Sequence, residues 1–152
     1  MLKRSDKATE LFKTGLNCSA SVAAAFSDIL GLSEQQAARF SCGLGGGVGR
    51  QREVCGAVCG AAMVLGFVFG GEDGKDKLSA YEKIQEFSKE FKRQNGSIIC
   101  RELLNLPSDF EIVPTPEKRT GEYYKKRPCV DLVSCAAEIL EKMLFESGEK
   151  NA

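Results

Sequence analysis

The feature that most constrains the fold of this chain is an uncharged segment of 18 residues, from Val54 to Gly71. This length is the minimum for a membrane-spanning helix. However, five of the residues are glycine, which makes the segment weakly hydrophobic, and a lone span would leave the other amphipathic helices without a partner. Gly56 and Gly60 have the spacing of closely packed helices. We therefore expect a buried helix over about 52–70, at the centre of a helical bundle.

The N-terminal part of the chain predicts three further helices. Ser5 is a candidate cap for a first helix that ends near Gly15. A second helix covers 18–30 and closes at Gly31, which suits a left-handed C-terminal residue. A third covers 33–42 and leads into a run of glycines. Strand patterns are scarce.

The C-terminal part predicts an amphipathic helix over about 75–94, which Asn95 and Gly96 terminate. Its apolar stripe consists of Leu78, Tyr81, Ile84, Phe87 and Phe91. Ser97 caps a short helical segment over 98–106, and 107–127 resembles a surface connection because it holds three prolines and many charges. Pro128 suits the first position of a last helix over 128–145. The apolar face of that helix is Val130, Val133, Ala137, Leu140 and Leu144.

No linker or repeat divides the chain. We expect residues 1–152 to form a single all-α domain. It would be a bundle of about six or seven helices around the central glycine- and alanine-rich helix.

Charge and histidine content exclude several kinds of chemistry. The 21 basic and 21 acidic residues cancel and the sequence has no basic run with interleaved aromatic residues, so we expect no nucleic-acid partner. The chain has no histidine, which excludes Ser–His and Cys–His catalysis, haem ligation by histidine and mixed His/Cys zinc sites. A metal here would need thiolate or carboxylate ligands.

Seven cysteines are present, an odd number, and the N-terminus lacks the apolar core of a secretory signal. We therefore expect a cytoplasmic protein with reduced thiols.

The glycine-rich stretch "CGLGGGVGRQREVCGAVCG", residues 42–60, raises the question of a phosphate loop. No lysine follows its glycines, and no GxGxxG begins at Gly43 or Gly45, so no nucleotide motif fits. A small anion site, formed by glycine amides, Arg50 and the start of the next helix, is the weaker alternative. A tight turn between packed helices is the preferred interpretation.

Four cysteines from separate parts of the chain fall near predicted helix N-termini: Cys18, Cys55, Cys100 and Cys129. The helix dipole and the free amides stabilise a thiolate at such a position, and a thiolate is both the nucleophile and the metal-binding form. The alternative is that these cysteines are small buried hydrophobes. Cys59, Cys42 and Cys135 have no assigned role; Cys59 shares a helix face with Cys55, and Cys135 suits packing.

The order of these residues resembles the C_GCAxxG_C_C family of redox-active proteins. The matching features are Cys18, "CGAVCG" at 55–60, Cys100 in "GSIICRELL", and Cys129 before "AAEILEKM". The resemblance implies functional roles for Cys18, Cys55, Cys100 and Cys129. It also implies an anaerobic bacterial or archaeal origin and a redox partner that is not identified, with a membrane transporter system as one candidate. Some related proteins carry haem through CxxCH, which is absent here, so haem is not expected.

Three functional hypotheses remain open. The first is thiol–disulfide chemistry, with Cys55 as the attacking thiolate, one of Cys18, Cys100 or Cys129 as the resolving thiol, and no cofactor. Arg50 or Arg52 would stabilise the thiolate electrostatically. The slightly favoured alternative is that both arginines are solvated surface charges.

The second is a metal site in which Cys18, Cys55, Cys100 and Cys129 bind zinc or an iron–sulfur cluster. The third is a non-catalytic helical binding module with buried cysteines.

Overall fold

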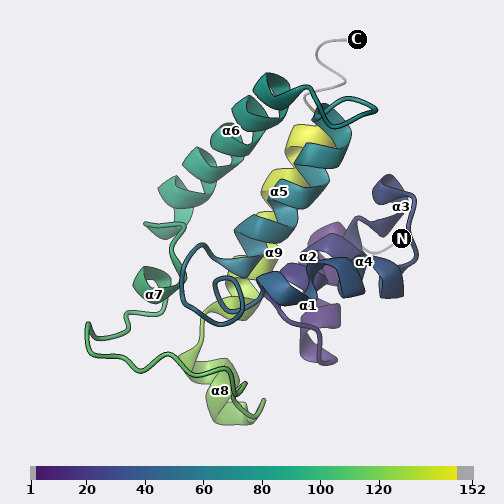
Figure 1. Cartoon of the computed structure of the whole chain (residues 1–152). Helices are drawn as coiled ribbons and strands as arrows, with labels where there is room; N and C mark the ends of the chain where they lie inside the picture. The colour runs from purple at the N-terminus through teal and green to yellow at the C-terminus, as the bar shows by residue number, and fades with distance from the viewer. Residues whose placement is uncertain (1–2, 147–152) are drawn as a thin grey trace.

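The computed structural model describes residues 3–146. Residues 1–2 and 147–152, which the predicted single domain includes, lie outside the described residues. Within 3–146 the chain forms nine α-helices and no strand, and one antiparallel bridge joins Val54 to Ile99 (Figure 1). The all-α class is confirmed.

The helices follow one another with short connections, apart from two longer irregular segments around 45–55 and 104–120. The α-helices are α1 (Arg4–Lys13), α2 (Cys18–Ala25), α3 (Ser27–Leu30), α4 (Glu34–Ser41), α5 (Gly56–Phe69), α6 (Lys77–Asn95), α7 (Cys100–Leu103), α8 (Gly121–Lys126) and α9 (Cys129–Glu141). A 3-10 turn (Cys42–Leu44) follows α4, and a π-type turn (Lys142–Glu146) follows α9.

Helix α5 lies at the centre of the bundle, as the uncharged segment predicts. It packs against α2, α6 and α9, and its first three turns are buried (Figure 1). Gly60 permits the close approach of α2, because a Cβ at this position would lie 2.7 Å from the carbonyl oxygen of Ser19. The last turn of α5 emerges from the core, and Phe67 is 58% exposed. None of the described helices is both long enough and apolar enough to cross a membrane.

Backbone conformation accounts for two differences from the predicted helix bounds. The predicted central helix, α5, begins at Gly56 rather than near 52, because residues 46–50 and Arg52 all have positive φ. Val48, Arg50 and Arg52 are non-glycine residues in this left-handed region, where side chains crowd the backbone. The predicted second helix is interrupted at Phe26, which ends α2 and precedes α3.

Several side-chain predictions also need correction. Ser5 is buried inside α1 and does not cap it, since the N-cap residue is Lys3. Ser97 accepts a hydrogen bond from the Ile99 amide, but Ile99 is the N-cap of α7. Pro128 is the N-cap of α9 rather than its first residue.

The α6 stripe is buried at its C-terminal end, at Phe87 and Phe91, while Leu78 and Tyr81 are exposed. Those two lie in the first turns of α6, on a side of the helix that faces solvent. Finally, the proline-rich connection 107–127 contains α8, capped by the side chain of Thr120.

Candidate functional site

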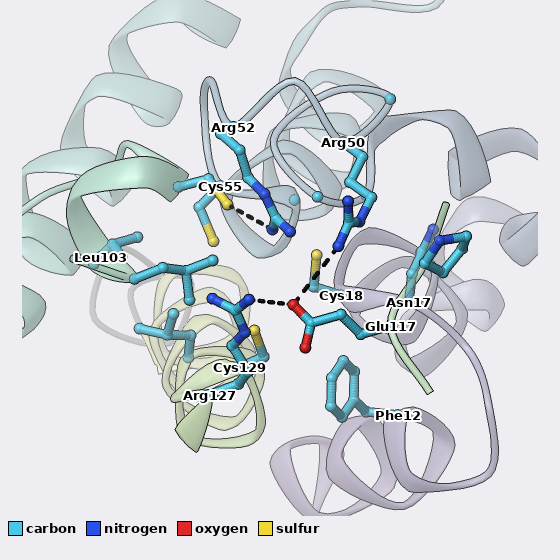
Figure 2. A pocket seen from close by; sticks show the side chains of 18 of the residues that line it. Phe12, Asn17, Cys18, Arg50, Arg52, Cys55, Leu103, Glu117, Arg127 and Cys129 are labelled. Atoms are coloured by element: carbon cyan, nitrogen blue, oxygen red, sulfur yellow. Dashed lines mark hydrogen bonds and ion pairs between the residues drawn. The ribbon is translucent and has the colours of Figure 1, made fainter. Parts of the chain in front are cut away.

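Four cysteines begin four different helices and line the same cavity. Figure 2 shows three of them, Cys18, Cys55 and Cys129, with their side chains in this cavity. Cys18, Cys100 and Cys129 are the first residues of α2, α7 and α9, and Cys55 is the N-cap of α5. The cavity has a volume of about 450 Å³. The predicted placement at helix N-termini is therefore confirmed, and the fold brings together thiols that are far apart in the sequence.

Helices α2 and α5 fix the position of Cys18. The side chain of Asn17 caps α2 by accepting a hydrogen bond from the Ala20 amide, and it also donates to the carbonyl oxygen of Cys42 (2.8 Å). The sulfur of Cys18 lies directly against Gly56, where a Cβ would overlap it. Gly56 is therefore required at this position for space, because any side chain would displace the Cys18 sulfur from the cavity.

The bridge between Val54 and Ile99 holds Cys55 and Cys100 side by side. The Cys55 amide donates to Ile98 O (2.7 Å), and the Cys100 amide donates to Glu53 O (2.6 Å). Both cysteines are buried, at 5% and 8% exposure. Two segments 45 residues apart in the sequence thus place their thiols at one wall of the cavity.

The fourth thiol comes from the far end of the chain. Two residues separate the end of α8 from Cys129, which starts α9, and Tyr123 on α8 lines the same cavity. Burial, followed by the nearby Cys129 thiol, raises the pKa of Tyr123 to about 12, so this hydroxyl keeps its proton at neutral pH.

Burial makes these thiols weaker acids than their helix positions predict. It raises the pKa of Cys18 and of Cys55, and it raises the pKa of Cys129 to about 11. The neighbouring sulfurs of the site add to the upward shift. Backbone amides oppose it without reversing it, from Gly46 and Ser19 at Cys18 and from Ala57 and Val58 at Cys55. At these three thiols desolvation therefore outweighs the helix dipole, which is opposite to the effect expected from their helix positions.

All seven cysteines are free thiols. Within residues 3–146, no three Cys, Asp or Glu side chains are arranged closely enough to hold a single metal ion.

The charged residues of the lining are four arginines and one carboxylate: Arg50, Arg52, Arg119, Arg127 and Glu117. Arg52 is only 7% exposed, so its interpretation as a solvated surface residue is wrong. Its guanidinium donates to the sulfur of Cys100 (3.6 Å), and its Nε has no hydrogen-bond partner. Arg50 donates to Val113 O and approaches Glu117 (3.6 Å). The cavity therefore carries an excess of positive charge next to the thiols.

Sequence reasoning missed the contribution of residues 107–127 to this site. Glu117 pairs with Arg127 and Arg50, while Arg119 donates to the carbonyl oxygens of Leu16 (2.8 Å) and Phe12 and lies over the Phe12 ring. No pattern of spacing marks these residues, because their partners come from distant parts of the chain.

The remaining cysteines occupy separate positions. Cys42 is exposed and lies at the cavity edge, whereas Cys59 and Cys135 do not line the cavity. Cys135 interacts with Gln94 (3.1 Å) and Asn95 (3.4 Å) on α6. The glycine loop forms a tight turn, which agrees with the interpretation preferred from the sequence. Cys55 occupies the N-cap position of α5.

Comparison with known proteins gives one match. The model of a family described as "Putative redox-active protein (C_GCAxxG_C_C)" matches residues 16–143, which include all four cavity cysteines. No curated protein and no solved structure matches the chain.

Proposed function

Because the chain belongs to the C_GCAxxG_C_C family of redox-active proteins, we propose that its redox centre is an iron–sulfur cluster. Cys18, Cys55, Cys100 and Cys129 would be the ligands. One observation carries the proposal: four thiols from four helix starts line one cavity, and none is bonded to another. Four thiolates are the usual ligand set for such clusters.

The surroundings of the sulfurs fit this group. Gly56 leaves space beside Cys18, and backbone amides at Cys18 and Cys55 favour the charged sulfur. The guanidinium of Arg52 next to Cys100 supplies positive charge where ligated thiolates are negative. A cluster suits the cavity better than one zinc ion, since no three of the described thiols are grouped closely enough for one ion and the cavity that they line has a volume of about 450 Å³.

The raised pKa values favour metal binding over nucleophilic chemistry. A buried thiol that keeps its proton at pH 7 reacts slowly with disulfides, because the thiolate is the nucleophile. A metal deprotonates a coordinating thiol outright and neutralises much of its charge. The cluster would carry electrons to and from a redox partner, for which a membrane transporter system remains a candidate, in the reducing cytoplasm.

Anaerobic purification or reconstitution with iron and sulfide tests the proposal. We expect a brown protein with charge-transfer absorption and matching amounts of iron and labile sulfide. Cys55→Ser should lose most of this absorption. Cys135→Ser should retain it, because Cys135 lies outside the cavity. A colourless protein that binds neither iron nor sulfide would contradict the proposal.

A dithiol–disulfide centre is the second candidate. The proximity of Cys18 and Cys55 favours it, since the Cys18 sulfur lies against Gly56, the residue that follows Cys55. Oxidation of two thiols to a disulfide would pass two electrons to an oxidised partner and release two protons. Mass spectrometry after anaerobic oxidation of the metal-free protein tests this candidate. A reversible loss of two mass units between cavity cysteines supports it, and seven alkylatable thiols after oxidation contradict it.

A further inference from the structure

A carboxylate of the chain itself lies between two arginines at the cavity. Figure 2 shows Glu117 pointing inward between Arg50 and Arg127, with the sulfur of Cys18 nearby. Glu117 forms ion pairs with both guanidiniums, at 3.6 Å to Arg50. The two arginine side chains are largely buried, with 15% and 17% exposure. The guanidiniums of both arginines thus converge on one oxygen, Oε1 of Glu117.

A third guanidinium nearby is incompletely satisfied. Arg52 is 7% exposed, lines the same cavity, and its Nε has no partner among the described residues. An unpartnered buried donor is costly, because it loses its hydrogen bonds to water. Three guanidiniums therefore share the single negative charge of Glu117, and the positive charge of this group exceeds it.

Glu117 belongs to a segment that side-chain contacts, rather than backbone pairing, hold against the rest of the molecule. Residues 107–119, here called the strap, contain no helix or strand. In the described part of the chain, the non-helical backbone hydrogen bonds of the strap are local, such as Phe110 N to Pro107 O and Thr120 N to Lys118 O. Side chains hold the strap instead. Arg50 donates to Val113 O (2.8 Å), Arg52 lies over the Phe110 ring, and Arg119 donates to Leu16 O. The Glu117 side chain is 40% exposed, so solvent reaches its position.

We propose that the cavity binds a small oxyanion in the position that the Glu117 carboxylate occupies between Arg50 and Arg127. The ligand class is an anion with at least two oxygens on one centre, such as a carboxylate or a tetrahedral oxyanion. Glu117 fills this position when the ligand is absent, and the ligand displaces it together with the strap.

The chemistry of guanidinium supports this ligand class. Its planar fork of N–H donors matches pairs of oxygens, and hydrogen bonds between charged groups are stronger than neutral ones. Burial, followed by repulsion from the nearby guanidinium of Arg52, lowers the pKa of Arg50. An anion bound between the arginines would reduce this repulsion. The site consists of arginine side chains, not of the glycine amides and helix start considered from the sequence, because Cys55 occupies that helix start.

Isothermal titration with sodium sulfate, against sodium chloride at equal ionic strength, tests the proposal. Glu117→Gln should bind sulfate about tenfold more tightly than the unchanged chain, because the internal competitor is gone. Arg127→Gln should bind at least about tenfold more weakly. The matched control is Arg93→Gln, whose side chain pairs with Glu90 on the exposed face of α6, and it should not differ from the unchanged chain. Equal affinities in all four proteins would overturn the proposal.

A second measurement needs no substitution and therefore does not depend on the folding of a variant. Sulfate should speed tryptic cleavage after Lys118 and Arg119 several-fold relative to chloride, since displacement of Glu117 frees the strap. Slower or unchanged cleavage would contradict the displacement. Acetate and phosphate then show whether planar or tetrahedral anions fit better. No cysteine is altered in these experiments, so iron content and absorption report separately on the proposed cluster.

Discussion

At the scale of single residues, desolvation controls the chemistry of the thiols. Cys18, Cys55 and Cys129 lie at helix starts, where a thiolate is normally favoured. Their pKa values nevertheless rise, because burial and the neighbouring thiols outweigh the amides. The thiols of such a site keep their protons until a metal or another cation stabilises the thiolates that form when the protons leave.

The raised pKa of Cys129 predicts a loss of stability at high pH. An unperturbed thiol has a pKa of 9.0, and the folded Cys129 has a pKa of about 11. Below pH 9 both states keep the proton and the contribution to stability is complete. Between pH 9 and 11 the unfolded chain ionises first, so the free energy of unfolding falls, by about 2–3 kcal/mol from this group.

Urea unfolding of the metal-free protein from pH 8 to 10.5 measures this effect. Cys129→Ser should show a flatter dependence than the unchanged chain. Identical slopes would mean that Cys129 titrates normally in the folded state.

Gly56 gives a prediction about space at the site. Gly56→Ala should displace the Cys18 sulfur, lower the free energy of unfolding by about 1–3 kcal/mol, and reduce iron binding. Gly66→Ala is the matched control on the same helix, since nothing lies within 4 Å of a Cβ there. It should stabilise α5 by about 0.5–1 kcal/mol. Urea unfolding and iron analysis of both variants check this, and equal behaviour would show that Gly56 is not needed for space.

At the scale of elements, hydrophobic patterning predicts helices better than it predicts their ends. The uncharged segment correctly indicates the central helix, because a glycine- and alanine-rich surface permits close packing on all sides. Its true start at Gly56 depends on consecutive left-handed residues, including Val48, for which no sequence signal exists. Helix α8 is not predicted from the sequence, because the prolines and charges around it indicate a surface connection, although Thr120 caps the helix.

The cap of α2 links helix stability to the position of Cys18. Asn17→Ala should lower the free energy of unfolding by about 1–2 kcal/mol, because α2 loses its cap and the Cys42 carbonyl loses a donor. Asn17→Asp should cost less, since aspartate still accepts from the Ala20 amide but donates nothing to Cys42. Chemical unfolding of the two variants checks the order. An Asp variant no more stable than the Ala variant would argue against the capping role.

At the scale of the whole molecule, the fold gathers positive charge at the cavity, although the formal net charge of the chain is zero. The chain has equal numbers of basic and acidic residues, yet four arginines and one carboxylate line the cavity. The four cysteines could be selected from their order and their helix positions. The arginines and Glu117 could not, because their meeting depends on how the strap crosses the helix starts.

The proposed cluster should couple to global stability. A ligand bound only by the folded state raises the free energy of unfolding. Anaerobic removal of iron by a chelator should therefore lower the melting temperature of the unchanged chain and of Cys135→Ser, while Cys55→Ser should melt at the same temperature before and after treatment. A chelator effect of equal size in Cys55→Ser would place the metal elsewhere.

The most direct test of the central claim is X-ray absorption at the iron edge of the anaerobically prepared protein. The proposal predicts a first shell of sulfur only, with iron–iron scattering beyond it, and loss of this signal in a variant with Cys18, Cys55, Cys100 and Cys129 all changed to serine. A first shell of oxygen or nitrogen, or an unchanged sulfur shell in the serine variant, would contradict it.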